Sequence, residues 1–179
     1  MRLFVALDLD ERVKGYLYDL QRNVSVEGAK ISFSSGFHVT LKFLGEVDTG
    51  SLTMIKSELR KVGFESFKAK TSGVGFFKKN NKIRVVWAGI EPKEEIKMLQ
   101  EKIDDSLYKV GFEKNRKFHS HVTLARVKYL KDKNKFIDNL KSMEKKEINF
   151  RVSSFVLFRS RLTRQGPIYE VLEKFKAKQ

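Results

Sequence analysis

The sequence predicts an α+β fold that is internally duplicated and bilobal. Two antiparallel sheets are expected, related by a pseudo-twofold axis around a central cleft, with the helices outside. The first observation behind this prediction is a repeated tetrapeptide: His38-Val39-Thr40-Leu41 recurs as His121-Val122-Thr123-Leu124, an offset of 83 residues (121 − 38). A repeat of this kind indicates that one structural unit is present twice. The second observation is that strand-like and helix-like patterns recur at the same offset and in the same order.

The apolar patterns around the repeated motif predict a strand and a helix in each half. The run Leu3–Leu7 falls on Val86–Ile90, and an acidic residue follows each run. Downstream, apolar residues three and four apart predict one buried helix face: Val13, Tyr16, Leu20 and Val24 fall on Ile96, Leu99, Ile103 and Leu107. The polar residues 78–81 between two strand-like runs predict an antiparallel hairpin.

The same reading gives each element in order. In the first half we expect strands near 2–8, 37–44 and 67–77, extended chain near 30–34, and helices near 10–24 and 51–62. In the second half we expect strands near 83–90, 118–127, 148–158 and 167–172, with helices near 93–110 and 132–143. No Gly/Ser-rich linker separates the halves, so residues 1–179 are expected to form a single domain of two repeated lobes, roughly 1–80 and 81–179, with strands exchanged between them.

Composition restricts the partners and the chemistry. Lys and Arg exceed Asp and Glu by 15 charges, which favours a polyanionic partner, although a Lys-rich chain without cysteine is also typical of heat-adapted proteins. The absence of cysteine excludes disulfides, thiol catalysis and thiolate metal sites. The apolar run Leu3–Leu7 stops at Asp8 and is too short for a signal peptide or a membrane span. We therefore expect a cytoplasmic protein without a membrane partner.

The two His-x-Thr pairs are the candidate catalytic residues. Residues i and i+2 of a strand point to the same face, so His38 projects with Thr40, and His121 with Thr123. One neutral imidazole could take a proton from water while the other, protonated, gives one to the leaving oxygen of a cyclic phosphodiester. The threonine hydroxyls could hold the non-bridging oxygens, and no metal or cofactor is required. The alternative for each histidine is an ordinary surface or hydrogen-bonded side chain; His119 is expected to be local support or rim.

At 38–45 (HVTLKFLG) and 121–126 (HVTLAR) the sequence resembles the 2H phosphoesterase superfamily, and more narrowly the RNA 2′,3′-cyclic phosphodiesterases, historically called 2′-5′ RNA ligases. The likeness spans essentially the whole chain. It implies hydrolysis of a 2′,3′-cyclic phosphate end of RNA to a 2′-phosphate, with reversible 2′-5′ ligation in some members. It also implies that His38 is the proton donor to O3′, that His121 is the proton acceptor, and that Thr40 and Thr123 hold the phosphate.

Further residues are expected to bind the substrate. The resemblance implies that Arg126, at the end of the second motif, adds positive charge near the phosphate. Phe43 and Tyr169 are aromatic candidates for a base or ribose, although burial in the core is the favoured alternative for Phe43. Lys42 is a candidate contact to the RNA strand. Family members often carry Trp, Pro and Asn before the first histidine and Pro before the second. Here Ile31, Phe33, Gly36 and Ser120 stand at those positions, which puts base stacking at the cleft in doubt.

The expected partner is RNA with a 2′,3′-cyclic phosphate end, tRNA fragments included, bound by a monomer. Three alternatives stay open at this point. The chain could be a non-catalytic module that binds single-stranded RNA, a cyclic phosphodiesterase acting on small nucleotides, or a protein with a metal site built from His38, His119 and His121.

Overall fold

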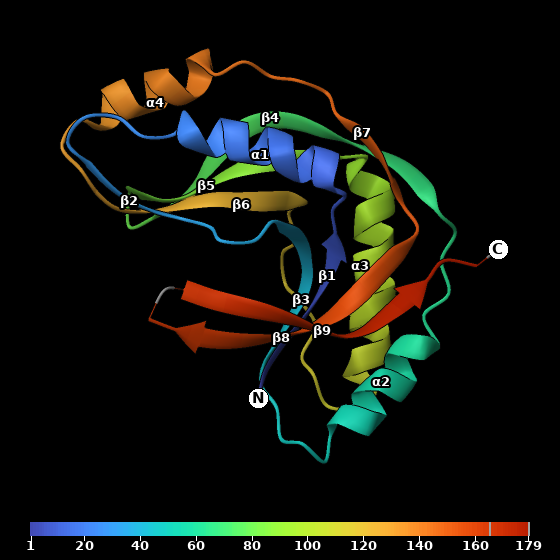
Figure 1. Cartoon of the computed structure of the whole chain (residues 1–179). Helices are drawn as coiled ribbons and strands as arrows, with labels where there is room; N and C mark the ends of the chain where they lie inside the picture. Colours follow the sequence, from blue (N-terminus) through green and yellow to red (C-terminus); the bar gives the residue numbers. More distant parts are fainter. Residues whose placement is uncertain (165, 179) are drawn as a thin grey trace.

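The computed structural model describes residues 1–164 and 166–178 and contains nine named strands and four named helices in these ranges (Figure 1). The strands are β1 (Arg2–Asp8), β2 (Ala29–Phe33), β3 (His38–Glu46), β4 (Phe67–Lys79), β5 (Lys82–Glu91), β6 (His121–Leu130), β7 (Asn149–Val152), β8 (Ser154–Thr163) and β9 (Gly166–Lys176). The helices are α1 (Glu11–Arg22), α2 (Leu52–Arg60), α3 (Lys93–Tyr108) and α4 (Lys133–Ser142). In these described residues, no helix is long and apolar enough to cross a membrane.

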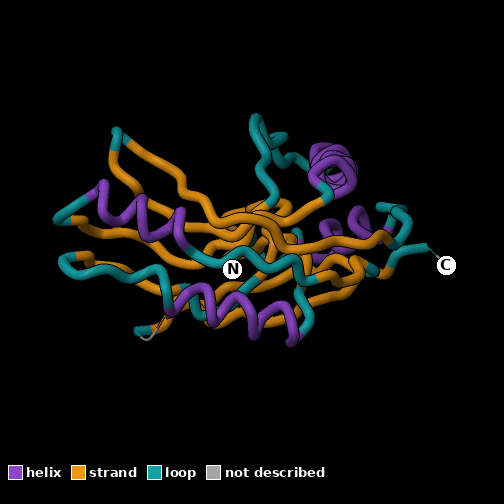
Figure 2. The backbone as a smooth tube through the Cα atoms, turned by 90° about the horizontal axis from the view of Figure 1, so that it is seen from above, coloured by secondary structure: helices purple, strands orange, loops and turns teal. Residues whose placement is uncertain are grey.

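The strands form two antiparallel groups joined at one point. The order is β7-β4-β5-β6-β3-β1-β8-β9. β2 also pairs with β6, along the edge opposite to β5. We call β3, β1, β8 and β9 the first lobe, and β7, β4, β5, β6 and β2 the second lobe. The lobes meet where β3 pairs with β6, through the single residue pair Val39–Val122. Each lobe therefore contains strands from both halves of the sequence, and the curled sheets are visible in Figures 1 and 2.

The helices cover the outer faces, and the core lies beneath them. α1 and α4 pack against strands of the second lobe, and α2 packs against the first lobe and against α3 (Figure 1). α3 contacts both lobes, through β3 and β5. Of the face predicted for α1, Val13 and Leu20 are buried and Tyr16 is partly buried, and Leu17 is buried beside them. The Asp10 side chain caps the helix by accepting from the Val13 N–H at 2.9 Å. One apolar cluster runs through both lobes. A second, smaller cluster of Phe4, Ala6, Val156 and Phe158 lies on the other face of the first lobe.

The predicted α+β class and the hairpin at 78–81 are confirmed. β4 and β5 pair down to Lys79–Lys82, and Asn80 and Asn81 adopt positive φ angles of 51° and 58°, which asparagine tolerates well. The single strand expected near 148–158 is wrong. The chain changes lobe at Ser153, so that β7 pairs with β4 and β8 pairs with β1. Buried residues on both sides of this crossing make the sequence look like one continuous strand.

The structure also corrects the alignment of the first strands. Val39 and Val122 are equivalent positions of the repeat, and their partners are Leu7 in β1 and Ala88 in β5. Leu7 is therefore equivalent to Ala88, whereas the constant offset of 83 aligned Leu7 with Ile90. The helices and motif strands follow the constant offset. The last strand is longer than expected, because β9 begins at Gly166 and pairs with β8 as far as Lys176.

Candidate functional site

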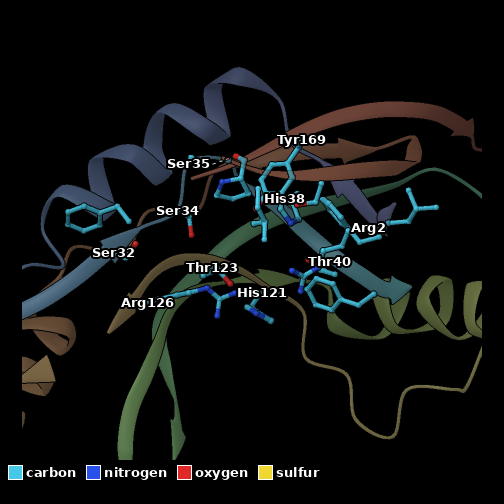
Figure 3. Close-up of a pocket in the computed structure, with 18 residues that line it drawn as sticks. Arg2, Ser32, Ser34, Ser35, His38, Thr40, His121, Thr123, Arg126 and Tyr169 are labelled. Atoms are coloured by element: carbon cyan, nitrogen blue, oxygen red, sulfur yellow. Dashed lines mark hydrogen bonds between the residues drawn. The ribbon is translucent and has the colours of Figure 1, made fainter. Parts of the chain in front are cut away.

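The two His-x-Thr repeats lie on adjacent strands and open into one cavity. Val39 and Val122, which pair at the junction of the lobes, are completely buried. Because strand side chains alternate between faces, the flanking histidines and threonines project together on the opposite face. His38, Thr40, His121 and Thr123 all line the same cavity of about 500 Å³ (Figure 3). Continuing the antiparallel register by one residue places each histidine beside the threonine of the other repeat.

A β-bulge follows the threonine in both motif strands. Ala6 pairs with Thr40 and Val5 with Lys42, so Leu41 is the extra residue in β3. In β6, Trp87 pairs with Thr123 and Val86 with Ala125, which makes Leu124 the equivalent extra residue. A bulge reverses the facing of every later residue in the strand. Phe43 and Arg126 are consequently brought to the cavity face, at equivalent positions of the two repeats.

The bulge decides which substrate-binding predictions agree with the structure. Phe43 is 68% exposed and lines the cavity, so the alternative of a buried core position for Phe43 is wrong. Lys42 is turned to the opposite face and does not line the cavity; its prediction as a substrate contact is wrong. It is only 2% exposed, its ammonium group lies 2.6 Å from the Asp104 carboxylate, and it also donates to the Glu113 carbonyl. Lys42 therefore joins the back of the first motif strand to α3.

His38 lies in an aromatic environment in the first lobe. Its ring centroid is 4.8 Å from Phe4, 6.2 Å from Phe158 and 5.0 Å from Tyr169, which meets it edge-on. This burial lowers the pKa of His38 from 6.5 to about 4; the Asp8 carboxylate acts against the shift, and the charge of His121 adds to it. In the free protein at neutral pH, His38 is a neutral imidazole.

His121 is held by a backbone hydrogen bond. Its Nδ1 lies 2.7 Å from the carbonyl oxygen of His119, and because a carbonyl oxygen only accepts, Nδ1 carries the proton of the neutral ring. Nε2 is then left as the basic nitrogen. Burial lowers the pKa of His121, opposed by the bond to His119 and reinforced by the charges of His119 and Arg126. The prediction of His119 as local support agrees with this contact, while its own ring packs 4.6 Å from Trp87 and does not line the cavity.

The walls of the cavity contain residues that sequence reasoning did not select. Tyr169 was predicted and lies on β9, whereas Arg2 on β1 was missed. Ser160 and Leu162 of β8 also line this wall. The segment 32–36, which includes Ser32, Phe33, Ser34, Ser35 and Gly36, forms another wall. Strand alternation could have indicated Arg2, because residues two apart in a strand share a face and both Arg2 and Phe4 line the cavity.

The metal-site alternative requires several donors around one point. Among residues 1–164 and 166–178, no group of three or more His, Cys, Asp or Glu side chains is arranged to hold a metal ion. The ring of His119 faces the Trp87 and Phe77 side chains, at 4.6 and 5.3 Å. The donor set that this alternative assumed is therefore not assembled.

Comparisons with known proteins identify the family. A model of the family described as LigT-like phosphoesterases matches residues 7–87 and again residues 90–169, once for each repeat. The RNA 2′,3′-cyclic phosphodiesterase of Methanocaldococcus jannaschii is 34% identical over 176 residues, covering 98% of this chain and 100% of the relative. That of Thermotoga maritima is 37% identical over 177 residues, covering 96% and 93%.

Solved structures show the same fold. The protein TT0787 of Thermus thermophilus superposes with a TM-score of 0.78 at 30% identity, covering 98% of this chain and 97% of its own. Escherichia coli LigT complexed with 3′-AMP superposes with a TM-score of 0.78 at 21% identity, covering 99% and 98%. The resemblance noted from the two His-x-Thr repeats is thus confirmed over nearly the whole chain. The chain belongs to the LigT-like phosphoesterase family.

Proposed function

We propose that this protein hydrolyses the 2′,3′-cyclic phosphate end of RNA to a 2′-phosphate by acid/base catalysis with two histidines. The observation that carries the proposal is the convergence of both His-x-Thr repeats on one cavity from adjacent strands. The names of the relatives support the substrate, since those of M. jannaschii and T. maritima are both RNA 2′,3′-cyclic phosphodiesterases. The excess of 15 positive charges also favours a polyanion.

His121 acts as the base in this scheme. Its Nδ1–H is donated to the His119 carbonyl, so Nε2 can accept a proton from the attacking water. The water oxygen bonds to phosphorus, and the bond between phosphorus and O3′ breaks. His38 gives its proton to O3′, which becomes the 3′-hydroxyl, while the phosphate stays on O2′. The Thr40 and Thr123 hydroxyls donate to the non-bridging oxygens, and Arg126 adds positive charge beside them.

Protonation of His38 must accompany substrate binding. With a pKa of about 4, the free imidazole is almost entirely neutral at pH 7. A bound cyclic phosphate brings a negative charge into a largely buried site, which favours the imidazolium and raises the pKa of His38. The substrate would therefore create the acid that its own cleavage needs.

The same geometry permits 2′-5′ ligation, because a 5′-hydroxyl can replace water as the nucleophile beside His121. Every side chain in the scheme comes from one chain, so we propose that a monomer is sufficient and that the protein acts in the cytoplasm, where RNA is available. tRNA fragments with cyclic phosphate ends are candidate substrates. The rival function, RNA binding without chemistry, would explain the charge but leaves the paired histidines and threonines without a role.

The test is incubation with an oligonucleotide that ends in a 2′,3′-cyclic phosphate, in EDTA, with separation of 2′- from 3′-phosphate products. We expect a 2′-phosphate, and a loss of about 10²–10⁴-fold in kcat for His38→Ala and for His121→Ala with RNA binding largely retained. His119→Ala is the matched control, since it keeps the carbonyl that orients His121, and its effect should be much smaller. Binding without turnover by the wild-type protein would establish the non-catalytic module instead.

A further inference from the structure

Arg2 is a cation in the cavity that the reaction scheme does not use. It stands at the start of β1, outside both His-x-Thr repeats, and lines the cavity. In the part of the chain that the structure describes, no carboxylate forms an ion pair with its guanidinium. Glu46, which pairs with Arg2 across the strands, instead lies 3.4 Å from the N-terminal amine. An uncompensated guanidinium facing a cavity favours an anionic ligand.

Arg2 belongs to a row of hydrogen-bond donors across three strands. It pairs with Ser160 of β8, which in turn pairs with Tyr169 of β9. Directly paired residues of antiparallel strands share a face, and all three line the cavity. No hydrogen-bond partner of the Ser160 hydroxyl occurs among the described residues. The row thus presents a guanidinium, a hydroxyl and a phenol to the same space.

An apolar band separates Arg2 and Ser160 of this row from the His-x-Thr repeats, whereas the Tyr169 ring reaches His38 at 5.0 Å. One step nearer to Thr40 along the sheet, Phe4 pairs with Phe43 on one side and with Phe158 on the other, at ring centroid distances of 6.2 and 5.1 Å. Arg2 lies two residues from Phe4, about 7 Å farther along the strand. From the repeats outward, the first lobe is therefore polar, apolar and polar again. A nucleotide chain has the same order: phosphate, nucleoside, phosphate.

Tyr169 links the two polar ends. Burial raises the pKa of its phenol, and the charges of Arg126 and Arg2 both act in the opposite direction, so both guanidiniums are within electrostatic reach of it. They come from different lobes, and in Figure 3 Arg126 lies toward the left and Arg2 toward the right, with Tyr169 and His38 above them. Two cationic side chains from different lobes therefore face the cavity that Tyr169 lines.

We propose that Arg2 and Ser160 bind the phosphodiester on the 5′ side of the terminal nucleotide, while Arg126 serves the cyclic phosphate. The preferred substrate is then the end of an oligonucleotide and not a mononucleoside cyclic phosphate. This inference rests on the proposed function and adds the class of substrate. Arginine suits the position because its planar group can donate two parallel hydrogen bonds to one phosphate.

Three substrates test it: adenosine 2′,3′-cyclic phosphate, the dinucleotide ApA with the same cyclic end, and that dinucleotide with a neutral methylphosphonate linkage. A charge-assisted hydrogen bond predicts that the wild-type kcat/KM for the charged dinucleotide exceeds the other two by about tenfold to a hundredfold. Arg2→Gln should remove most of that preference, and Arg2→Lys should restore part of it. The salt dependence of kcat/KM for the charged dinucleotide should become shallower in Arg2→Gln.

Arg161→Gln is the matched control. Arg161 lies between Ser160 and Leu162, which line the cavity while Arg161 does not, so its side chain is on the other face of β8. Arg161→Gln removes the same charge as Arg2→Gln and should keep the wild-type preference for the charged dinucleotide. Equal kcat/KM for all three substrates in the wild-type protein, or equal losses on all three in Arg2→Gln, would overturn the assignment of Arg2 and leave the proposed function standing. If the wild-type protein turns over none of them, the proposed function itself fails.

Discussion

Burial of His38 predicts a specific sensitivity of the fold to acid. The pKa of His38 is lowered to about 4 from an ordinary value of 6.5, and each pH unit of such a displacement corresponds to about 1.36 kcal/mol. The unfolded chain therefore binds this proton more readily than the folded protein does. Stability contributed by neutral His38 is fully present above pH 6.5 and is lost as the pH falls toward 4. At pH 4 the loss from this one residue should be about 3 kcal/mol.

The assay is urea unfolding of the wild-type protein and of His38→Gln at pH 7 and at pH 4. Other titrating groups are common to both proteins, so the difference between the two pH dependences isolates His38. We expect the wild-type protein to lose about 3 kcal/mol more than the variant over this interval. Signals of the His38 ring in an NMR titration, assigned by their absence in the variant, should move near pH 4. Added inorganic phosphate should shift that midpoint upward if the anion binds beside the imidazole.

Two results would show that the reasoning is mistaken. If both proteins lose the same free energy of unfolding between pH 7 and pH 4, burial of this imidazole does not oppose its protonation. A His38 titration midpoint near 6.5 in the free protein would lead to the same conclusion. It would also remove the argument that the substrate has to create the acid, because an ordinary histidine would already be partly protonated at neutral pH.

Three further predictions concern the pH profile, a buried ion pair and two glycines. Because the pKa values of both repeat histidines are lowered, both limbs of the kcat/KM profile should lie below pH 6.5. The alkaline limb of the kcat profile should lie at higher pH, because bound phosphate stabilises the imidazolium. Alkaline limbs at the same pH in the two profiles would contradict this. Lys42→Met leaves the buried Asp104 carboxylate without its ion-pair partner and should cost about 3–5 kcal/mol in urea unfolding. Adding Asp104→Leu should restore only part of this, because it removes the acceptor of the Gln100 amide and the Asn115 N–H. A cost below about 1 kcal/mol would show that the pair is not desolvated. A Cβ at Gly75 would lie 2.3 Å from the Trp87 ring, so Gly75→Ala should cost about 1–3 kcal/mol and change tryptophan fluorescence. At Gly15, in α1 with no atom within 4 Å of a new Cβ, alanine should instead stabilise the fold by about 0.5–1 kcal/mol, and a similar loss at both glycines would exclude the steric explanation.

Local patterns in the sequence were sufficient for most of the elements and for the convergence of each histidine with its threonine. The repeat at His38 and His121, together with helical and strand periodicities, predicted the α+β class, and strand alternation predicted that each histidine shares a face with its threonine. The register of the sheet was less accessible, because it depends on bulges that no residue type announces. Plain alternation puts Lys42 on the cavity face, whereas the bulge at Leu41 replaces it with Phe43.

Contacts between distant segments could not be predicted from local patterns. The change of lobe at Ser153 is hidden because apolar residues continue on both sides of it. Arg2 could be recognised as a surface cation, but its position beside Ser160 and Tyr169 depends on the pairing of β1 with β8 and of β8 with β9. Residues separated by most of the chain meet there, and a single sequence contains no record of which strands pair.

The duplication supplies two imidazoles, and the departures from symmetry give them different environments. Both motif strands have the same bulge, yet the residue that it turns toward the cavity is aromatic in the first repeat, Phe43, and cationic in the second, Arg126. His121 donates Nδ1–H to a backbone carbonyl and so presents a basic nitrogen, whereas His38 packs among aromatic rings. A perfectly symmetric pair would have equal pKa values and no preferred direction of proton transfer. Because the environments differ, packing and hydrogen bonding support the proposed assignment of one donor and one acceptor, which the repeated tetrapeptide alone does not encode.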